Sequence, residues 1–119
     1  MIILYGIPNC DTIKKALNWF KVNKIAIEFY DYKKHSVSQA KLKSWIKQVG
    51  YDVLINKKSA TWRALSLAEQ QAISNHTAAI ALMMKHTSVI KRPVVEIDEK
   101  VVMIGFSEEE YATKFSDEL

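Results

Sequence analysis

The chain has 119 residues, of which 49% are hydrophobic and 25% charged, with three glycines and two prolines. This composition is typical of one globular domain and excludes a disordered or low-complexity chain. The net charge of +4 suits an anionic ligand but is too small to predict direct binding of nucleic acid. No apolar run approaches the roughly 20 residues of a membrane helix, and the first residues lack a basic signal-peptide region. We therefore expect a cytoplasmic protein with no membrane partner.

The first third of the chain alternates strand and helix patterns. Residues 2–5 form an apolar, β-branched run that ends at Gly6, which predicts a buried strand. The apolar residues that follow recur with helical spacing: Ile13, Ala16, Leu17 and Phe20. Asn9 is positioned to be the N-cap of this helix. Alternation over residues 25–32 predicts a second strand, and two strands joined through a helix run parallel.

The middle of the chain is mainly helical. Ser38 precedes a helical stripe that ends at Gly50. Within residues 51–65, whose pattern is mixed, the charged and small residues of "NKKSA" (56–60) indicate a turn or loop. Ser66 and Glu69 have the spacing of a capping box at the start of another helix. Helical spacing predicts core positions for Trp19, Trp45 and the Met83–Met84 pair.

Two strands and a helix close the chain. Residues 94–98 and 101–105 are apolar, and the short link between them predicts an antiparallel hairpin. Ser107 and Glu110 predict a second capping box on the last helix. The order is thus β-α-β, a helical insert at about 36–88, and β-β-α. It predicts an α/β fold, a thioredoxin-like four-stranded mixed sheet, in a single domain over residues 1–119.

Cys10, the only cysteine, lies where the first strand gives way to the first helix. The free N–H groups and the dipole of a helix start stabilise a thiolate, which lowers the thiol pKa. Lys14 would add to this effect and Asp11 would oppose it. Arg92, in the loop before the third strand, would lie near the same helix start and supply a fixed positive charge. Two other interpretations stay open: Cys10 as a small core residue and Arg92 as a surface residue.

Four stretches in chain order resemble the arsenate-reductase-related (ArsC/Spx) family of thioredoxin-fold proteins: "YGIPNCDTIKKA", "DYKK", "LINKKSATWRAL" and "IKRPVV". The "GIPNCDT" turn and the "NK…TWR" segment are similar to the YffB-like branch. The resemblance implies a reactive cysteine at Cys10 and an Arg-Pro pair with cis proline at Arg92 and Pro93. Arsenate reductases of this family that work with glutaredoxin hold their oxyanion with three arginines. This chain matches only Arg92, with Asn56 and residues 105–106 in the other two places, which argues against arsenate reduction.

The resemblance and the single cysteine together predict a glutathione-dependent thiol reductase that uses one nucleophile, Cys10, with Arg92 stabilising the thiolate and the anion. Without a second thiol, an outside thiol must resolve a mixed disulfide on Cys10, and glutathione is the abundant candidate. We expect no tightly bound cofactor and glutathione as co-substrate, held by these residues: Asn9, Lys14, Asn56, Lys57, Trp62, Arg63 and Pro93. Core packing for Trp62 and a solvated loop for Lys57 are the alternatives.

A regulator like the Spx proteins is the second hypothesis, with the helical insert docking on RNA polymerase and no catalysis. Position 13 is Ile13, so the Cys-x-x-Cys switch that is usual in those regulators is absent. The expected partners are glutathione or another small thiol, an oxidised protein thiol, or polymerase, and the expected oligomeric state is a monomer. The three histidines, at positions 35, 76 and 86, are too scattered to predict a metal site.

Overall fold

A computed structural model describes all residues, 1–119, as two compact units. The first unit, which we call the sheet unit, comprises Met1–His35 and Arg92–Leu119. The second, the helical unit, comprises Ser36–Lys91. No helix in either unit is long and apolar enough to cross a membrane. Whether the chain behaves as a single domain with an insert stays a prediction.

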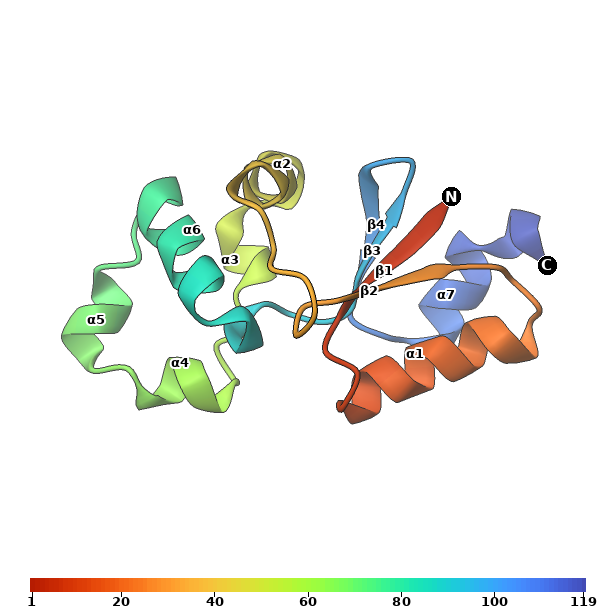
Figure 1. The fold of residues 1–119 in the computed structure, drawn as a ribbon, viewed down its shortest axis with the longest axis horizontal. Helices are drawn as coiled ribbons and strands as arrows, with labels where there is room; N and C mark the ends of the chain where they lie inside the picture. The colour runs from red at the N-terminus through yellow and green to blue at the C-terminus, as the bar shows by residue number, and fades with distance from the viewer. The chain divides into compact units, whose positions relative to one another are not determined.

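The sheet unit contains, in chain order, β1 (Ile2–Gly6), α1 (Asp11–Val22), β2 (Glu28–Asp31), β3 (Val94–Ile97), β4 (Lys100–Ile104), α7 (Glu108–Lys114) and the short 3-10 helix η2 (Ser116–Glu118). The four strands form one sheet in the order β2-β1-β3-β4 (Figure 1). β1 pairs in parallel with β2 and antiparallel with β3, and β3 pairs antiparallel with β4. The predicted mixed sheet of a thioredoxin-like fold is confirmed.

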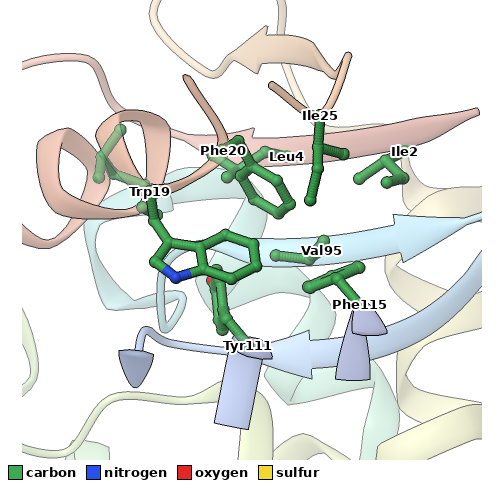
Figure 2. Packing of buried hydrophobic residues seen from close by; sticks show 10 residues of the cluster. Ile2, Leu4, Trp19, Phe20, Ile25, Val95, Tyr111 and Phe115 are labelled. Atoms are coloured by element: carbon green, nitrogen blue, oxygen red, sulfur yellow. The ribbon is translucent and has the colours of Figure 1, made fainter. Parts of the chain in front are cut away.

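One face of the sheet carries the core of this unit. Leu4 of β1 stands opposite Val95 of β3, and both are fully buried in a cluster with residues of α1 and α7. The two helices lie on the same side of the sheet (Figure 1). Trp19 of α1 meets Tyr111 of α7 edge-on, with ring centroids 5.5 Å apart, as Figure 2 shows. Because aromatic side chains bury a large apolar area, these contacts help to hold both helices on the sheet.

The backbone periods explain which residues turn inward. α1 has apolar residues at helical spacing, and its buried positions are Ile13, Ala16, Trp19 and Phe20. Successive strand residues alternate between faces, so Leu4 faces the core while Tyr5 lies on the second face. The second strand is shorter than predicted: β2 begins at Glu28, because the buried Ile25 belongs to the turn after α1, where its N–H donates to the Phe20 carbonyl.

The helical unit contains α2 (Gln39–Val49), α3 (Tyr51–Leu54), α4 (Ala60–Ala64), α5 (Leu67–Gln71), α6 (His76–Lys85) and the 3-10 helix η1 (Thr87–Val89). α2 packs against α3 and α6. The side chain of Ser38 caps α2 as predicted, and Ser66 with Glu69 forms the predicted capping box of α5. The turn expected near residues 56–60 is confirmed at residues 57–59. It lies between two short helices, α3 and α4, and Ser59 caps the second of them.

Three further expectations need correction. α1 begins after Cys10 rather than Asn9, so the cysteine itself is the N-cap. The Ser107 side chain accepts the backbone N–H of Glu110 at 3.3 Å, but only Ser66 heads a reciprocal capping box. Met83 is fully buried, whereas Met84 is 48% exposed, because neighbouring residues of a helix point about 100° apart and only one of the pair faces the core.

Candidate functional site

Cys10 occupies the junction between β1 and α1. Its backbone is extended, with φ −146° and ψ 129°, and its carbonyl accepts the first helical hydrogen bond from the Lys14 N–H at 2.9 Å. The residue is partly exposed. The thiol therefore lies at a helix start, partly exposed and packed against the core of the sheet unit.

Arg92 reaches the sulfur from the segment that leads into β3. Its Nε–H donates a hydrogen bond to Cys10 Sγ at 3.3 Å, across 82 positions of sequence. The Arg92–Pro93 peptide bond is cis, as the resemblance implied. Pro93 is buried, and its carbonyl accepts the N–H of Gly105 at 2.8 Å, which ties the segment to the end of β4. This contact anchors the backbone from which the Arg92 side chain reaches the thiol.

Gly6 makes room for this arrangement. A methyl group there would overlap Cδ1 of Ile13, the buried residue in the first turn of α1, and would lie 3.7 Å from Cβ of Arg92. Glycine at the end of β1 thus lets the Ile13 side chain pack close to the backbone, and no special backbone angle of Gly6 is involved. The residue lets the helix start and the arginine come close to the same strand end.

The surroundings favour the thiolate. Burial raises the pKa of the Cys10 thiol. Three neighbours lower it: the backbone N–H of Ile13, the hydrogen bond and charge of Arg92, and the backbone N–H of Thr12. Their combined effect is larger than that of burial, so the pKa lies below its ordinary value of 9.0. The sulfur makes no conventional cap hydrogen bond to the first turn. The two backbone N–H groups therefore act on it as nearby positive dipoles, while Arg92 supplies the directed bond.

Two other predicted site residues flank the pair. Asn9 and Lys14 are both exposed, one just before Cys10 and one a helical turn after it. The described contact of Lys14 with the cysteine is through its backbone N–H. Both are thus available to a ligand that reaches the sulfur, and their binding roles stay predictions.

The remaining predicted ligand-binding residues belong to the helical unit. The Asn56 side chain accepts the Lys58 N–H at 3.0 Å and so shapes a turn. Lys57 lies 3.9 Å from a carboxylate oxygen of Asp52, with its ammonium 5.8 Å from the centre of the Trp62 ring. A cavity of about 300 Å³ is lined by Asp52, Ile55, Asn56, Lys57, Lys58 and Lys91. Trp62 is 8% exposed, so most of its ring packs in the core, whereas Arg63 is exposed on α4.

The sequence reasoning missed a polar cluster on the second face of the sheet. The hydroxyl of Tyr5 donates to Oε1 of Glu96 at 2.8 Å, and Glu96 is fully buried. Tyr32 has a buried hydroxyl that lacks a hydrogen-bond partner. The signal in the sequence was Glu96 itself, a charged residue between apolar neighbours in the strand predicted over residues 94–98.

Comparison with known proteins agrees with this architecture. A model described as the ArsC family matches residues 5–114. An uncharacterised protein of Haemophilus influenzae is 39% identical over 116 residues, covering 98% of this chain and all of the relative. The global transcriptional regulator Spx 2 of Bacillus anthracis is 28% identical, covering 92% of this chain and 83% of its own.

Solved structures are similar over nearly the whole chain. A YffB protein superposes with a TM-score of 0.87 at 36% identity, covering 96% of this chain and 98% of its own. An arsenate reductase related protein from Brucella melitensis gives a TM-score of 0.79 at 36% identity, covering 96% and 93% of the two chains. The likeness thus extends through both the sheet unit and the helical unit.

Proposed function

The chain belongs to the ArsC family, and from this membership and the geometry around Cys10 we propose that it is a glutathione-dependent thiol reductase with a single nucleophilic cysteine. The observation that carries the proposal is the hydrogen bond from Arg92 Nε to Cys10 Sγ, at a helix start where the thiol is partly exposed. A partly exposed thiol with a lowered pKa and a hydrogen bond from a guanidinium has the properties of a nucleophile.

The reaction begins with attack by the Cys10 thiolate on the glutathione sulfur of a mixed disulfide between glutathione and a substrate thiol. A bond forms between Cys10 Sγ and that sulfur, the disulfide bond of the substrate breaks, and the substrate leaves as a thiolate that takes a proton from solvent. The Cys10 thiolate supplies the two electrons that reduce the substrate disulfide and is itself oxidised to a mixed disulfide with glutathione.

A second glutathione then restores the enzyme. Its thiolate attacks the glutathione sulfur held on Cys10, which releases oxidised glutathione and the Cys10 thiolate. Since the chain has one cysteine, no second protein thiol can perform this step. Arg92 acts in both steps by stabilising Cys10 as a leaving group and as an attacking group.

Two cations of the sheet unit, Lys14 and Arg92, are proposed to bind the anionic groups of glutathione. Carboxylates bind such groups through charge-assisted hydrogen bonds. Asn9 and Pro93 complete the proposed set beside Cys10, and each is tested by the loss of glutathione affinity on substitution. Roles in glutathione binding for Asn56, Lys57, Trp62 and Arg63 of the helical unit stay predictions from the sequence.

Mass spectrometry and turnover test this proposal together. Mild peroxide with glutathione should add about 305 Da, one glutathione in disulfide linkage, on Cys10, and the purified protein should reduce a glutathione mixed disulfide with glutathione as the only reductant. Cys10→Ser should abolish both results. An exposed-residue control, Lys24→Gln, should leave both unchanged. A protein that neither takes up glutathione nor turns over would refute the proposal.

A second candidate function is a regulator that binds RNA polymerase, supported by the 28% identity to Spx 2 over 92% of this chain. Under this hypothesis the thiol chemistry is dispensable for binding. Recovery of polymerase subunits from a cell extract by both the wild-type protein and Cys10→Ser, without glutathione turnover, would favour it over the reductase.

A further inference from the structure

Tyr111 of α7 is fully buried in the core of the sheet unit, although its side chain ends in a hydroxyl group. Its ring meets those of Phe106 and Phe115 edge-on, with centroids 4.8 Å and 5.5 Å apart. Figure 2 shows the ring among its aromatic neighbours. Phenylalanine would make the same ring contacts. The packing of α7 thus accounts for the ring of Tyr111 and leaves its hydroxyl to be explained.

The Tyr111 hydroxyl binds the turn that follows β4. It donates a hydrogen bond to the carbonyl of Gly105 at 2.6 Å. Burial raises the pKa of this hydroxyl, so it remains a protonated donor at neutral and mildly alkaline pH. Gly105 has a φ of +85°, in the left-handed region that glycine adopts readily. A bond on its carbonyl therefore restricts a residue with much conformational freedom of its own.

Gly105 in turn holds the segment that leads into β3. Its N–H donates to the carbonyl of Pro93 at 2.8 Å. Proline has no N–H, so this carbonyl is the only backbone group of Pro93 that forms hydrogen bonds. Because both the N–H and the carbonyl of Gly105 are bonded, the peptide groups on its two sides are both held in place.

The same segment carries the cation of the thiol site. Arg92 directly precedes Pro93, and its Nε–H donates to Cys10 Sγ at 3.3 Å. Three hydrogen bonds thus connect Tyr111 with the thiol by way of Gly105, Pro93 and Arg92. All of these residues belong to the sheet unit. Each step is a direct contact or a covalent bond, so a change at the Tyr111 hydroxyl has a defined route to the guanidinium.

We propose that Tyr111 is a positioning residue for the thiol, because its hydroxyl holds the turn at Gly105 and thereby the backbone from which Arg92 reaches Cys10. The proposal rests on the proposed function in taking Cys10 as the reacting group. Hydrogen bonds weaken steeply as their alignment is lost. A looser Arg92 backbone therefore lowers the fraction of molecules in which the guanidinium bonds the thiolate. Tyr111 acts through Arg92 and has no chemical step of its own.

The test is the pH profile of alkylation of the full chain by iodoacetamide, which gives the midpoint of thiolate formation. Tyr111→Phe keeps the ring and removes the hydroxyl. We expect the midpoint to rise, with a loss of about two- to threefold in the thiolate fraction at a pH below it. This loss is smaller than that expected on replacement of Arg92, because the charge stays. A hydroxyl that only stabilised the fold would leave the midpoint of the folded protein unchanged.

Tyr5→Phe is the matched control. It removes another tyrosine hydroxyl bond of the sheet unit, the one to Oε1 of Glu96 at 2.8 Å. We expect this variant to lose stability and to keep the wild-type midpoint. An equal shift of the midpoint in Tyr5→Phe and Tyr111→Phe would overturn the proposal, since it would show a general effect of a weakened fold.

A double mutant tests the route through Arg92. In an Arg92→Gln background, the further change Tyr111→Phe should no longer move the midpoint, because the hydroxyl acts through the arginine. A shift of the same size in both backgrounds contradicts the proposal, and so does a folded Tyr111→Phe protein with the wild-type profile.

A second variant keeps the test open should Tyr111→Phe fail to fold. Gly105→Ala disturbs the same turn without altering the core, because a side chain there meets no atom within 4 Å and only the positive φ opposes it. It should also raise the midpoint. A folded Gly105→Ala protein with the wild-type midpoint would refute the positioning role.

None of these measurements uses glutathione, so the two proposals fail separately. A raised midpoint in Tyr111→Phe, in a protein whose wild type shows no turnover, refutes only the reductase. Normal turnover with an unmoved midpoint refutes only the positioning role.

Discussion

Replacement of Arg92 by glutamine should raise the pKa of the Cys10 thiol and make the protein a slower nucleophile at neutral pH. Glutamine keeps a polar side chain of similar reach but removes the positive charge and the Nε–H that lies 3.3 Å from Sγ. The N–H groups of Thr12 and Ile13 remain, so part of the lowering of the pKa should survive. The change therefore isolates the contribution of the arginine from that of the helix start.

The magnitude follows from the distance and the exposure. Two unit charges about 4 Å apart interact by about 4 kcal/mol near a protein surface, and a hydrogen bond to a charged group contributes about 1.5–3 kcal/mol. Cys10 is partly exposed, so solvent screening reduces these figures, and exposed ion pairs retain about 1 kcal/mol. We therefore take about 1.5 kcal/mol for the pair, which corresponds to about a tenfold loss of thiolate below the midpoint.

The assay is the midpoint of thiolate formation, read from the rate of iodoacetamide alkylation against pH. Arg92→Lys should fall between the wild type and Arg92→Gln, because it keeps the charge but loses the planar donor. Lys21→Gln serves as the control, since its side chain is exposed and lies in the last turn of the same helix, away from Cys10. An Arg92→Gln protein that is folded and has the wild-type midpoint would show that the helix start alone activates the thiol.

Three further outcomes are expected. The pKa of Cys10 in the folded protein lies below 9.0, so the thiolate adds stability that is fully present above pH 9 and is lost as the pH falls through the folded pKa. Urea titrations should therefore show that the free energy of unfolding, relative to Cys10→Ser, rises with pH in that window. Gly6→Ala should destabilise the fold by about 1–3 kcal/mol, because the added methyl meets Ile13, and should also slow alkylation of the thiol in the remaining folded protein. Tyr111→Phe should cost about 1–2 kcal/mol in thermal unfolding, because the Gly105 carbonyl loses the hydroxyl that binds it at 2.6 Å, and unchanged stability would contradict this role.

Elements with a strong local signal were predictable from the sequence. The helical period of α1 and the caps Ser38 and Ser66 depend on neighbours within one or two turns, so they are visible in the sequence alone. The boundaries of β2 were not, because Ile25 has an apolar side chain that packs in the core while its backbone leaves the strand ladder. Burial and strand pairing are separate properties, and a pattern of apolar residues reports only burial.

In the candidate site, too, the features that depend on nearby residues were predictable from local patterns and those that depend on distant ones were not. The position of Cys10 at a helix start follows from local sequence, whereas its contact with Arg92 depends on the pairing of β1 with β3, which no local pattern encodes. The order of the predicted elements placed the loop before the third strand beside the helix start, and the resemblance implied the same Arg-Pro pair. The hydrogen bond between Tyr5 and Glu96 also joins two strands, and neither residue type indicates its partner. Contacts across the sheet were therefore predicted only where the order of elements or a relative implied them.

The separation of the thiol and its cation along the chain has a consequence for synthesis. Cys10 leaves the ribosome 82 positions ahead of Arg92, and the whole helical unit is translated between them. Until that later segment has emerged and β3 has docked on β1, the nascent polypeptide lacks the share of the thiol's acidity that Arg92 supplies. Full acidity of the sulfhydryl therefore requires both translation of the segment that carries Arg92 and pairing of β3 with β1.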